Sequence, residues 1–142
     1  MDLYRNAQET EAAALTLLNA GHYRQCVYFS CLAVELYLKS KLHLVEHHID
    51  LESSHNIIGL YDTLSSRFKS KTNMRPMMVR CRKYFNESRY PYESDISAYT
   101  QTFAKEFTDF LANVRNYIDN ECIATMEDLQ EKYPGSTDLN LR

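Results

Sequence analysis

The stretch HYRQCVYFSCLAVELYLKSKL, from His22 to Leu42, decides the fold class of this 142-residue chain. Between Cys26 and Leu38 its only polar residues are Ser30 and Glu35. With 3.6 residues per turn of an α-helix, apolar side chains then point in almost every direction, which is typical of a helix buried in a bundle or a membrane. These thirteen residues are too few to cross a bilayer, which takes about 20. The stretch therefore predicts the central helix of a bundle with amphipathic neighbours.

The flanking sequence supplies such neighbours. Residues 2–20 carry small and apolar side chains on one face and are followed by Gly21, which suits the positive φ that often ends a helix. Helical spacing returns from residue 55 to 68, with Ser53 or Ser54 as candidate N-caps, and again from 74 to 85, where Pro76 is acceptable in a first turn. Tyr90 precedes a proline and is expected in a loop with extended backbone.

The most regular stripe of the chain follows that loop. Its apolar residues recur at steps of three and four, so it should pack along the central helix: Ile96, Tyr99, Phe103, Phe107, Phe110, Val114 and Tyr117. Beyond it, Thr125 and Asp128 could cap one more short helix. The pattern predicts an all-α fold with five main helices, in which residues 1–120 form one helical bundle and 121–142 a short helix and a frayed tail.

Composition narrows the class of protein. With 44% hydrophobic and 25% charged residues the chain reads as globular, and 3 Gly with 3 Pro leave little for an all-β fold or a glycine-rich phosphate loop. The four cysteines form no CxxC pair, which favours a reduced protein of the cytoplasm. The first ten residues have no apolar run that would indicate a signal peptide. We expect neither a membrane-spanning segment nor a cofactor.

Basic residues gather in one segment although the net charge is −3. Between residues 67 and 89 the single acid is Glu87, and the segment holds half of the 16 Lys and Arg: Arg67, Lys69, Lys71, Arg75, Arg80, Arg82, Lys83 and Arg89. A local basic segment on an acidic protein points to a discrete anionic partner. The alternative is an ordinary solvated helix face and loop.

Two charged residues stand out within this pattern. Glu35 lies in the apolar helix and needs a partner, because an unpaired buried charge costs several kcal/mol. Lys39 one turn later, Arg89 or another residue of the basic segment could serve, unless Glu35 faces a solvated seam. Arg89 lies among tyrosines in the sequence SRYPYE. A guanidinium binds phosphate through two hydrogen bonds and nearby rings can stack on a base, so Arg89 and Tyr90 are candidate nucleotide ligands. A loop packed by its own tyrosines is the alternative.

A zinc-peptidase pattern, H-x-x-E-H, is formed by His43, Glu46 and His47. It lies at a polar helix end, where the helix dipole favours histidine in any case. No Ser-His-Asp or Cys-His set stands out. We therefore expect no metal site and assign no catalytic residue.

The sequence resembles the HEPN domain family, named for higher-eukaryote and prokaryote nucleotide-binding proteins, over residues 1 to about 118. Four pieces in order carry the resemblance: Ala20-Gly21-His22-Tyr23-Arg24, CLAVELYLKS from Cys31 to Ser40, His55 at the start of a helix, and SRYP from Ser88 to Pro91. The resemblance implies an up-and-down antiparallel helical bundle, dimeric through its long helices, with a polar or basic cleft for a nucleotide or RNA.

Many HEPN domains are ribonucleases that carry R-x(4–6)-H. In this sequence the last histidine is His55, and only Arg5 and Arg24 precede it, neither at that distance. Histidine as general base and arginine as charge stabiliser are the core of that chemistry. Metal-independent RNA cleavage by the family mechanism is therefore in doubt.

Two hypotheses follow. In the first, the chain is a non-catalytic module that binds ATP, GTP or RNA, forms a homodimer, and acts beside a nucleotidyltransferase; the 11 Tyr and 6 Phe also favour an interface. In the second, it is a ribonuclease or a component of a toxin–antitoxin or defence system that uses other residues, such as His55 with Arg89. The predicted nucleotide-binding residues are Arg89, Tyr90, Lys39, Arg82, Lys83 and His55, with Glu35 as a structural or site carboxylate.

Overall fold

The computed structural model describes residues 2–45, 56–90 and 96–123. Within these ranges the chain contains helices and no strand, which confirms the all-α fold with five main helices. The elements are α1 (Leu3–Asn19), α2 (Tyr23–Val45), α3 (Ile57–Arg67), α4 (Arg75–Arg89), the 3₁₀-helix η1 (Ile96–Ala98), α5 (Gln101–Asn116) and the π-helical turn η2 (Tyr117–Glu121). The predicted short helix after residue 121, with Thr125 and Asp128, lies outside the described residues.

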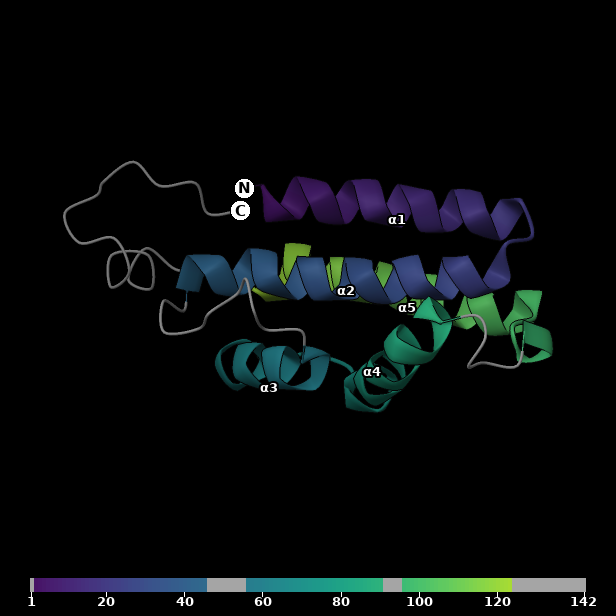
Figure 1. The fold of residues 1–142 in the computed structure, drawn as a ribbon. Helices are drawn as coiled ribbons and strands as arrows, with labels where there is room; N and C mark the ends of the chain where they lie inside the picture. The colour runs from purple at the N-terminus through teal and green to yellow at the C-terminus, as the bar shows by residue number, and fades with distance from the viewer. Residues whose placement is uncertain (1, 46–55, 91–95, 124–142) are drawn as a thin grey trace.

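The helices are arranged around α2, which packs against α1, α3, α4 and α5. Figure 1 shows α1 lying antiparallel beside α2 along the length of the molecule, with α5 behind α2. The shorter helices α3 and α4 lie on the other side of α2 from α1. The sequence interpretation of His22–Leu42 as the central helix is therefore confirmed.

The turn between α1 and α2 follows from Gly21. This residue has φ +82°, in the left-handed region that glycine adopts without strain. The N–H of His22 donates to the carbonyl of Leu17 at 2.9 Å, and the N–H of Gly21 to that of Leu18 at 3.2 Å. These two bonds form a Schellman motif, which satisfies the last carbonyls of α1 and reverses the chain direction. The predicted role of Gly21 is confirmed.

One face of α2 departs from the expectation of burial on all sides. Val34, Tyr37 and Leu38 are fully buried, but Phe29 and Leu32 on the outward face are only half-buried. Leu36 continues this half-buried apolar stripe one turn further along. The four neighbouring helices do not surround α2 completely. One face of α2 therefore stays partly exposed although its residues are apolar.

Helix starts also refine the sequence reading. α3 begins after Asn56, whose side chain accepts from the N–H of Gly59 at 3.2 Å, so the expected caps Ser53 and Ser54 are wrong. α5 begins after Thr100, whose hydroxyl accepts from the N–H of Phe103 at 3.1 Å. The stripe that was expected to open with Ile96 therefore starts later, and Ile96 is 61% exposed. In both cases the helix begins at the residue whose side chain caps it and not where the apolar spacing begins. The cap decides because it satisfies backbone N–H groups that have no partner in the first turn.

The aromatic residues pack on one another inside the bundle. Tyr84 of α4 makes edge-to-face contacts with Tyr99, Phe103 and Phe107, with ring centroids 6.4, 5.0 and 5.7 Å away. Among the aromatic residues that the structure describes, Tyr90 is the exposed one. The aromatic content is accommodated within this part of the fold and does not by itself require an interface.

Candidate nucleotide-binding site

Arg89 is the last residue of α4, and aromatic rings surround its guanidinium. The guanidinium carbon lies 5.5 Å from the ring centroid of Phe85 and 5.9 Å from those of Tyr28 and Tyr90. Tyr28 belongs to α2, one turn after its start, so two helices build the site. These four residues, Arg89, Tyr28, Phe85 and Tyr90, are called the Arg89 corner below.

The last turn of α4 is held against α2 at this corner. Arg24 Nη1 of α2 donates to the carbonyl of Ser88, and the hydroxyl of Ser88 donates to the carbonyl of Tyr84 at 2.5 Å. Arg24 and Arg89 both lie at the C-terminal end of α4, where the helix dipole favours cations. Tyr90 caps the helix with φ −115° and ψ 94°, the extended geometry expected before proline. These contacts hold the backbone on both sides of Arg89 in place.

The corner leaves one cation and one ring open to solvent. Phe85 is buried and Tyr28 half-buried, whereas Arg89 is exposed and Tyr90 is 38% exposed. Hydrogen bonding with Tyr90 is the main cause that raises the pKa of Arg89, against a smaller opposing effect of burial. Arg89 therefore offers a permanent positive charge next to an accessible aromatic face, the combination that binds a phosphate and a stacked base.

Two more of the predicted residues, Arg82 and Lys83, lie on the outer face of α4. Both are exposed, and the ammonium of Lys83 lies 5.3 Å from the ring centroid of Tyr84. Arg89 follows Arg82 by seven positions, which is about two helical turns, so the two side chains share a helix face with a rise of about 10 Å between them. They add positive potential near the corner but do not form part of it.

Lys39 and Glu35 lie elsewhere, inside the bundle. Lys39 Nζ is 3.3 Å from Glu35 Oε2, and the two side chains are 6% and 4% exposed. Of the partners considered for Glu35, Lys39 is therefore the one in contact, while the Arg89 guanidinium lies over the three rings. Lys39 is about 16 Å further along α2 than Tyr28. The structure does not bring Lys39 to the Arg89 corner, and His55 lies outside the described residues.

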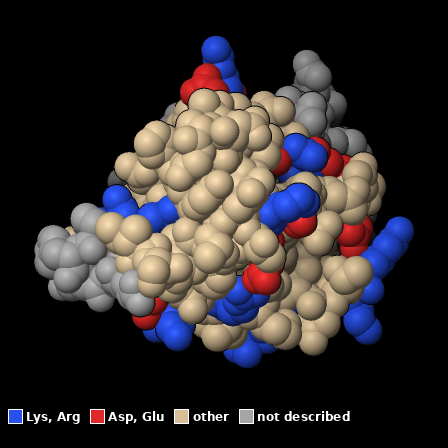
Figure 2. All heavy atoms as spheres, turned by 90° about the vertical axis from the view of Figure 1, so that its right-hand side faces the viewer, with Lys and Arg blue, Asp and Glu red and all other residues tan. Residues whose placement is uncertain are grey.

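The basic segment is partly neutralised by the fold. Arg75 pairs with Asp62 at 3.2 Å, and Arg80 pairs with Glu106 at 2.7 Å while lying over Phe103 and Phe107. Figure 2, which views the end of the bundle where α1 turns into α2, shows Lys and Arg dispersed among Asp and Glu, without a continuous basic surface. Within the described residues, the basic side chains of the segment without an acidic partner are Lys69, Lys71, Arg82, Lys83 and Arg89.

All four cysteines are free and buried. Burial raises the pKa of the Cys31 thiol, and its neighbour Cys81 raises it further. The described residues contain no group of three or more side chains able to hold a metal ion. Glu46 and His47 of the zinc-peptidase pattern lie outside them.

Sequence reasoning missed Tyr28 in the corner. Tyr28 is 61 residues before Arg89, and the only signal was its place in an apolar helix. It also missed a polar cluster in which Glu11 of α1 joins Tyr37 of α2 and Arg115 of α5. Contacts between distant helices leave no local pattern in one sequence.

The comparisons with known proteins agree on the class. Residues 1–121 match the HEPN domain model, and the chain therefore belongs to the HEPN domain family. The crystal structure of TT1696 from Thermus thermophilus is similar, with a TM-score of 0.70 over 84% of this chain and 98% of that chain. At 22% identity this similarity shows a shared fold. No curated protein shows a significant sequence match. In the described residues, no helix is long and apolar enough to span a membrane.

Proposed function

We propose that this chain is a non-catalytic HEPN module that binds a nucleotide. The observation that carries the proposal is the Arg89 corner, where an exposed guanidinium is framed by three rings and has no acidic partner among the described residues. Membership of the HEPN family and the missing R-x(4–6)-H motif support the same reading.

In this proposal the phosphates of ATP or GTP, or of an RNA, bind to Arg89 through charge-assisted hydrogen bonds. The base stacks on the exposed ring of Tyr90, and Arg82 and Lys83 attract the anion at longer range. Lys39 does not contact the nucleotide in this proposal, because it is paired with Glu35 inside the bundle. A contribution of His55 stays a prediction.

The test is a titration of ATP, GTP and a short RNA against the parent and Arg89→Ala. Loss of a charge-assisted contact should weaken binding about 10- to 150-fold. Arg75→Ala is the matched control, because Arg75 is exposed on the same helix but is engaged with Asp62; it should bind like the parent. A parent protein that binds none of the three probes contradicts the proposal.

The same preparation separates binding from catalysis. An RNA cleavage assay should show no turnover by the parent. Cleavage that disappears in both His55→Ala and Arg89→Ala would establish the ribonuclease hypothesis in its place. That result would also support a role in a toxin–antitoxin or defence system, which is part of the ribonuclease hypothesis.

The partner proteins belong to the same proposal. The half-buried stripe of Phe29, Leu32 and Leu36 on α2 supports a homodimer through this face. Leu32→Gln should then sediment as a folded monomer while Val79→Gln, at an exposed apolar residue of α4, keeps the dimer. A parent that sediments only as the 16.7 kDa species contradicts the dimer. A nucleotidyltransferase partner in the cytoplasm rests on the family resemblance, and a neighbouring gene for such an enzyme is its first test.

A further inference from the structure

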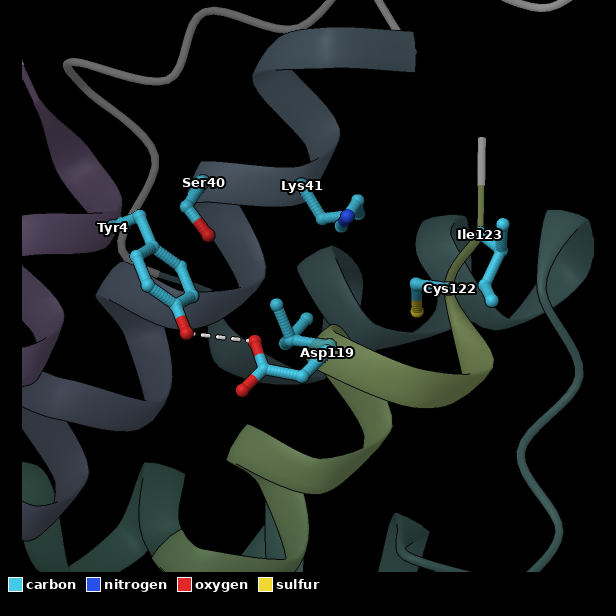
Figure 3. Close-up of a pocket in the computed structure, with 7 residues that line it drawn as sticks. Tyr4, Ser40, Lys41, Asp119, Cys122 and Ile123 are labelled. Carbon is cyan, nitrogen blue, oxygen red and sulfur yellow. Dashed lines mark hydrogen bonds between the residues drawn. The ribbon is translucent and has the colours of Figure 1, made fainter. Parts of the chain in front are cut away.

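The cavity between α1, α2 and η2, which Figure 3 shows, has a volume of about 300 Å³ and is lined by groups that already interact. The Tyr4 hydroxyl donates to Asp119 Oδ1 at 2.8 Å, as the dashed line marks. Tyr4, Lys41 and Asp119 also take part in further interactions. Burial raises the pKa of the Cys122 thiol to about 12, so it is neutral at physiological pH. Among the described residues that line it, this cavity offers a ligand no charged group that is not already engaged.

A second hollow, formed mainly by the loop between α3 and α4, differs in this respect. It has a volume of about 380 Å³, and Lys69 and Lys71 line it together with Arg75 and one acid, Asp62. Arg75 donates to Asp62 from Nε at 3.2 Å and from Nη2 at 3.3 Å, so these two charges compensate each other. Lys69 and Lys71 are exposed and have no acidic partner among the described residues. The hollow therefore keeps two uncompensated positive charges.

The loop is held in place by hydrogen bonds that leave these ammonium groups unused. The Ser70 hydroxyl donates its one proton to the carbonyl of Thr72 at 2.6 Å, so it accepts in its 2.9 Å contact with the Tyr61 hydroxyl. The backbone N–H of Lys71 donates to Glu121 Oε1 of η2 at 2.6 Å. A loop that is fixed before binding loses less conformational entropy when a ligand binds, so the hollow is preorganised.

Several donors of the same loop stay available. The hydroxyl of Thr72, which lines the hollow, has no hydrogen-bond partner in the part of the chain that the structure describes. Nor do the backbone N–H groups of Thr72 and Asn73 donate to any described acceptor. With the two ammonium groups, these donors suit an anion that has several acceptor oxygens. A phosphate monoester carries three such oxygens and a charge of about −1.5 to −2, which matches two lysines, whereas a carboxylate or a phosphodiester carries a single charge.

We propose that the hollow of the α3–α4 loop binds a phosphate dianion, either free or as the monoester of a small metabolite. Lys69 and Lys71 bind its oxygens through charge-assisted hydrogen bonds, and the Thr72 hydroxyl donates a third. The hollow lies at the start of α4, about 21 Å along this helix from Arg89. It is thus separate from the proposed nucleotide site and does not depend on it.

The test is a titration of the full chain, followed by amide NMR spectroscopy, with inorganic phosphate, glycerol phosphate, dimethyl phosphate and acetate at equal ionic strength. Inorganic phosphate or glycerol phosphate should bind, and whichever binds more tightly shows whether the ligand is free or esterified. Dimethyl phosphate and acetate, with one charge each, should bind about 10-fold more weakly or worse. The amide resonances of Lys69, Thr72 and Asn73 should shift, whereas those of Tyr28 and Tyr90 should not.

Three variants locate the contacts. Lys69→Gln and Lys71→Gln each remove one charge and should weaken binding about 10-fold. Thr72→Val removes the hydroxyl, keeps the shape of the side chain and should weaken binding about 2- to 10-fold. All three residues are exposed, so the variants should fold. Lys105→Gln is the control, because it removes an exposed lysine of α5 that does not line the hollow, and it should bind like the parent.

Four results would overturn the proposal: neither phosphate probe binds, acetate binds as tightly, both lysine variants bind like the parent, or the amide shifts are confined to the Arg89 corner. Lys105→Gln binding as weakly as the lysine variants of the loop would show a general effect of net charge and would overturn it too. The amide shifts of the loop decide this question whatever the nucleotide titrations show.

Discussion

Two clusters of arginine and tyrosine in this protein have opposite surroundings. In the first, the Tyr37 hydroxyl donates to Glu11 Oε1 at 2.5 Å and Arg115 Nη1 donates to Glu11 Oε2 at 2.7 Å. The Glu11 side chain is 8% exposed. In the second, the Arg89 corner, the cation meets three rings and solvent.

The difference between them is one carboxylate. Glu11 accepts hydrogen bonds from a cation and from a buried hydroxyl at once, and it ties α1, α2 and α5 together. Arg89 keeps its charge uncompensated by any acidic side chain among the described residues. The first cluster therefore stabilises the bundle, and the second is available to a ligand.

The largest expected effect is on the Glu11 cluster. Glu11→Ala leaves the fully buried Tyr37 hydroxyl without its acceptor, which costs about 1–3 kcal/mol of unfolding free energy, and it also removes the contact to the half-exposed Arg115. Urea denaturation measures the loss. Glu9→Ala on the same helix is the control, because its pair with Arg5 is exposed on both sides and should contribute little. Equal stability of the two variants would remove the structural role of Glu11.

A second effect appears on raising the pH. Burial raises the pKa of Cys122 to about 12, and it also raises the pKa values of Tyr37, Tyr117 and Cys31. The unfolded chain loses its thiol protons near pH 8.5, before the folded chain does, so stability should fall as pH rises above that value, by at most about 1.4 kcal/mol per pH unit for each group.

Melting temperatures between about pH 7 and 10.5 measure this slope. Cys122→Ala should make the slope shallower, whatever its effect at neutral pH. A slope that is the same with and without the thiol would show that Cys122 titrates alike in the folded and unfolded chain.

The smallest expected effect on stability is that of Arg89→Ala. The side chain is exposed, and of the three rings beside it Phe85 is buried, Tyr28 is half-buried and Tyr90 is already exposed. The melting temperature should therefore stay close to that of the parent while nucleotide binding falls. A melting temperature lowered as far as in Glu11→Ala would make the Arg89 corner a structural cluster like the first, and the contrast between the two would be lost.

The sequence determined the features that depend on neighbours within a few residues. The helical spacing of apolar residues predicted α2, α4 and the buried stripe of α5. Gly21 lies at the turn after α1, where φ is positive, and Pro76 lies in the first turn of α4, as their backbone preferences predict. The contact between Glu35 and Lys39 could also be predicted from the sequence, because side chains four residues apart on a helix are neighbours. The family pattern of short motifs in order identified the HEPN fold for the same reason.

Only the tertiary structure decided which groups from different helices meet. Glu11 and Arg115 are 104 residues apart and Arg24 reaches the carbonyl of Ser88 over 64, and no local pattern encodes either pairing. Tyr28 joined Arg89, Lys39 was buried away from it, and one apolar face of α2 stayed partly open. Each outcome depends on how helices of fixed shape pack against one another, and packing is set by the whole set of side chains at once.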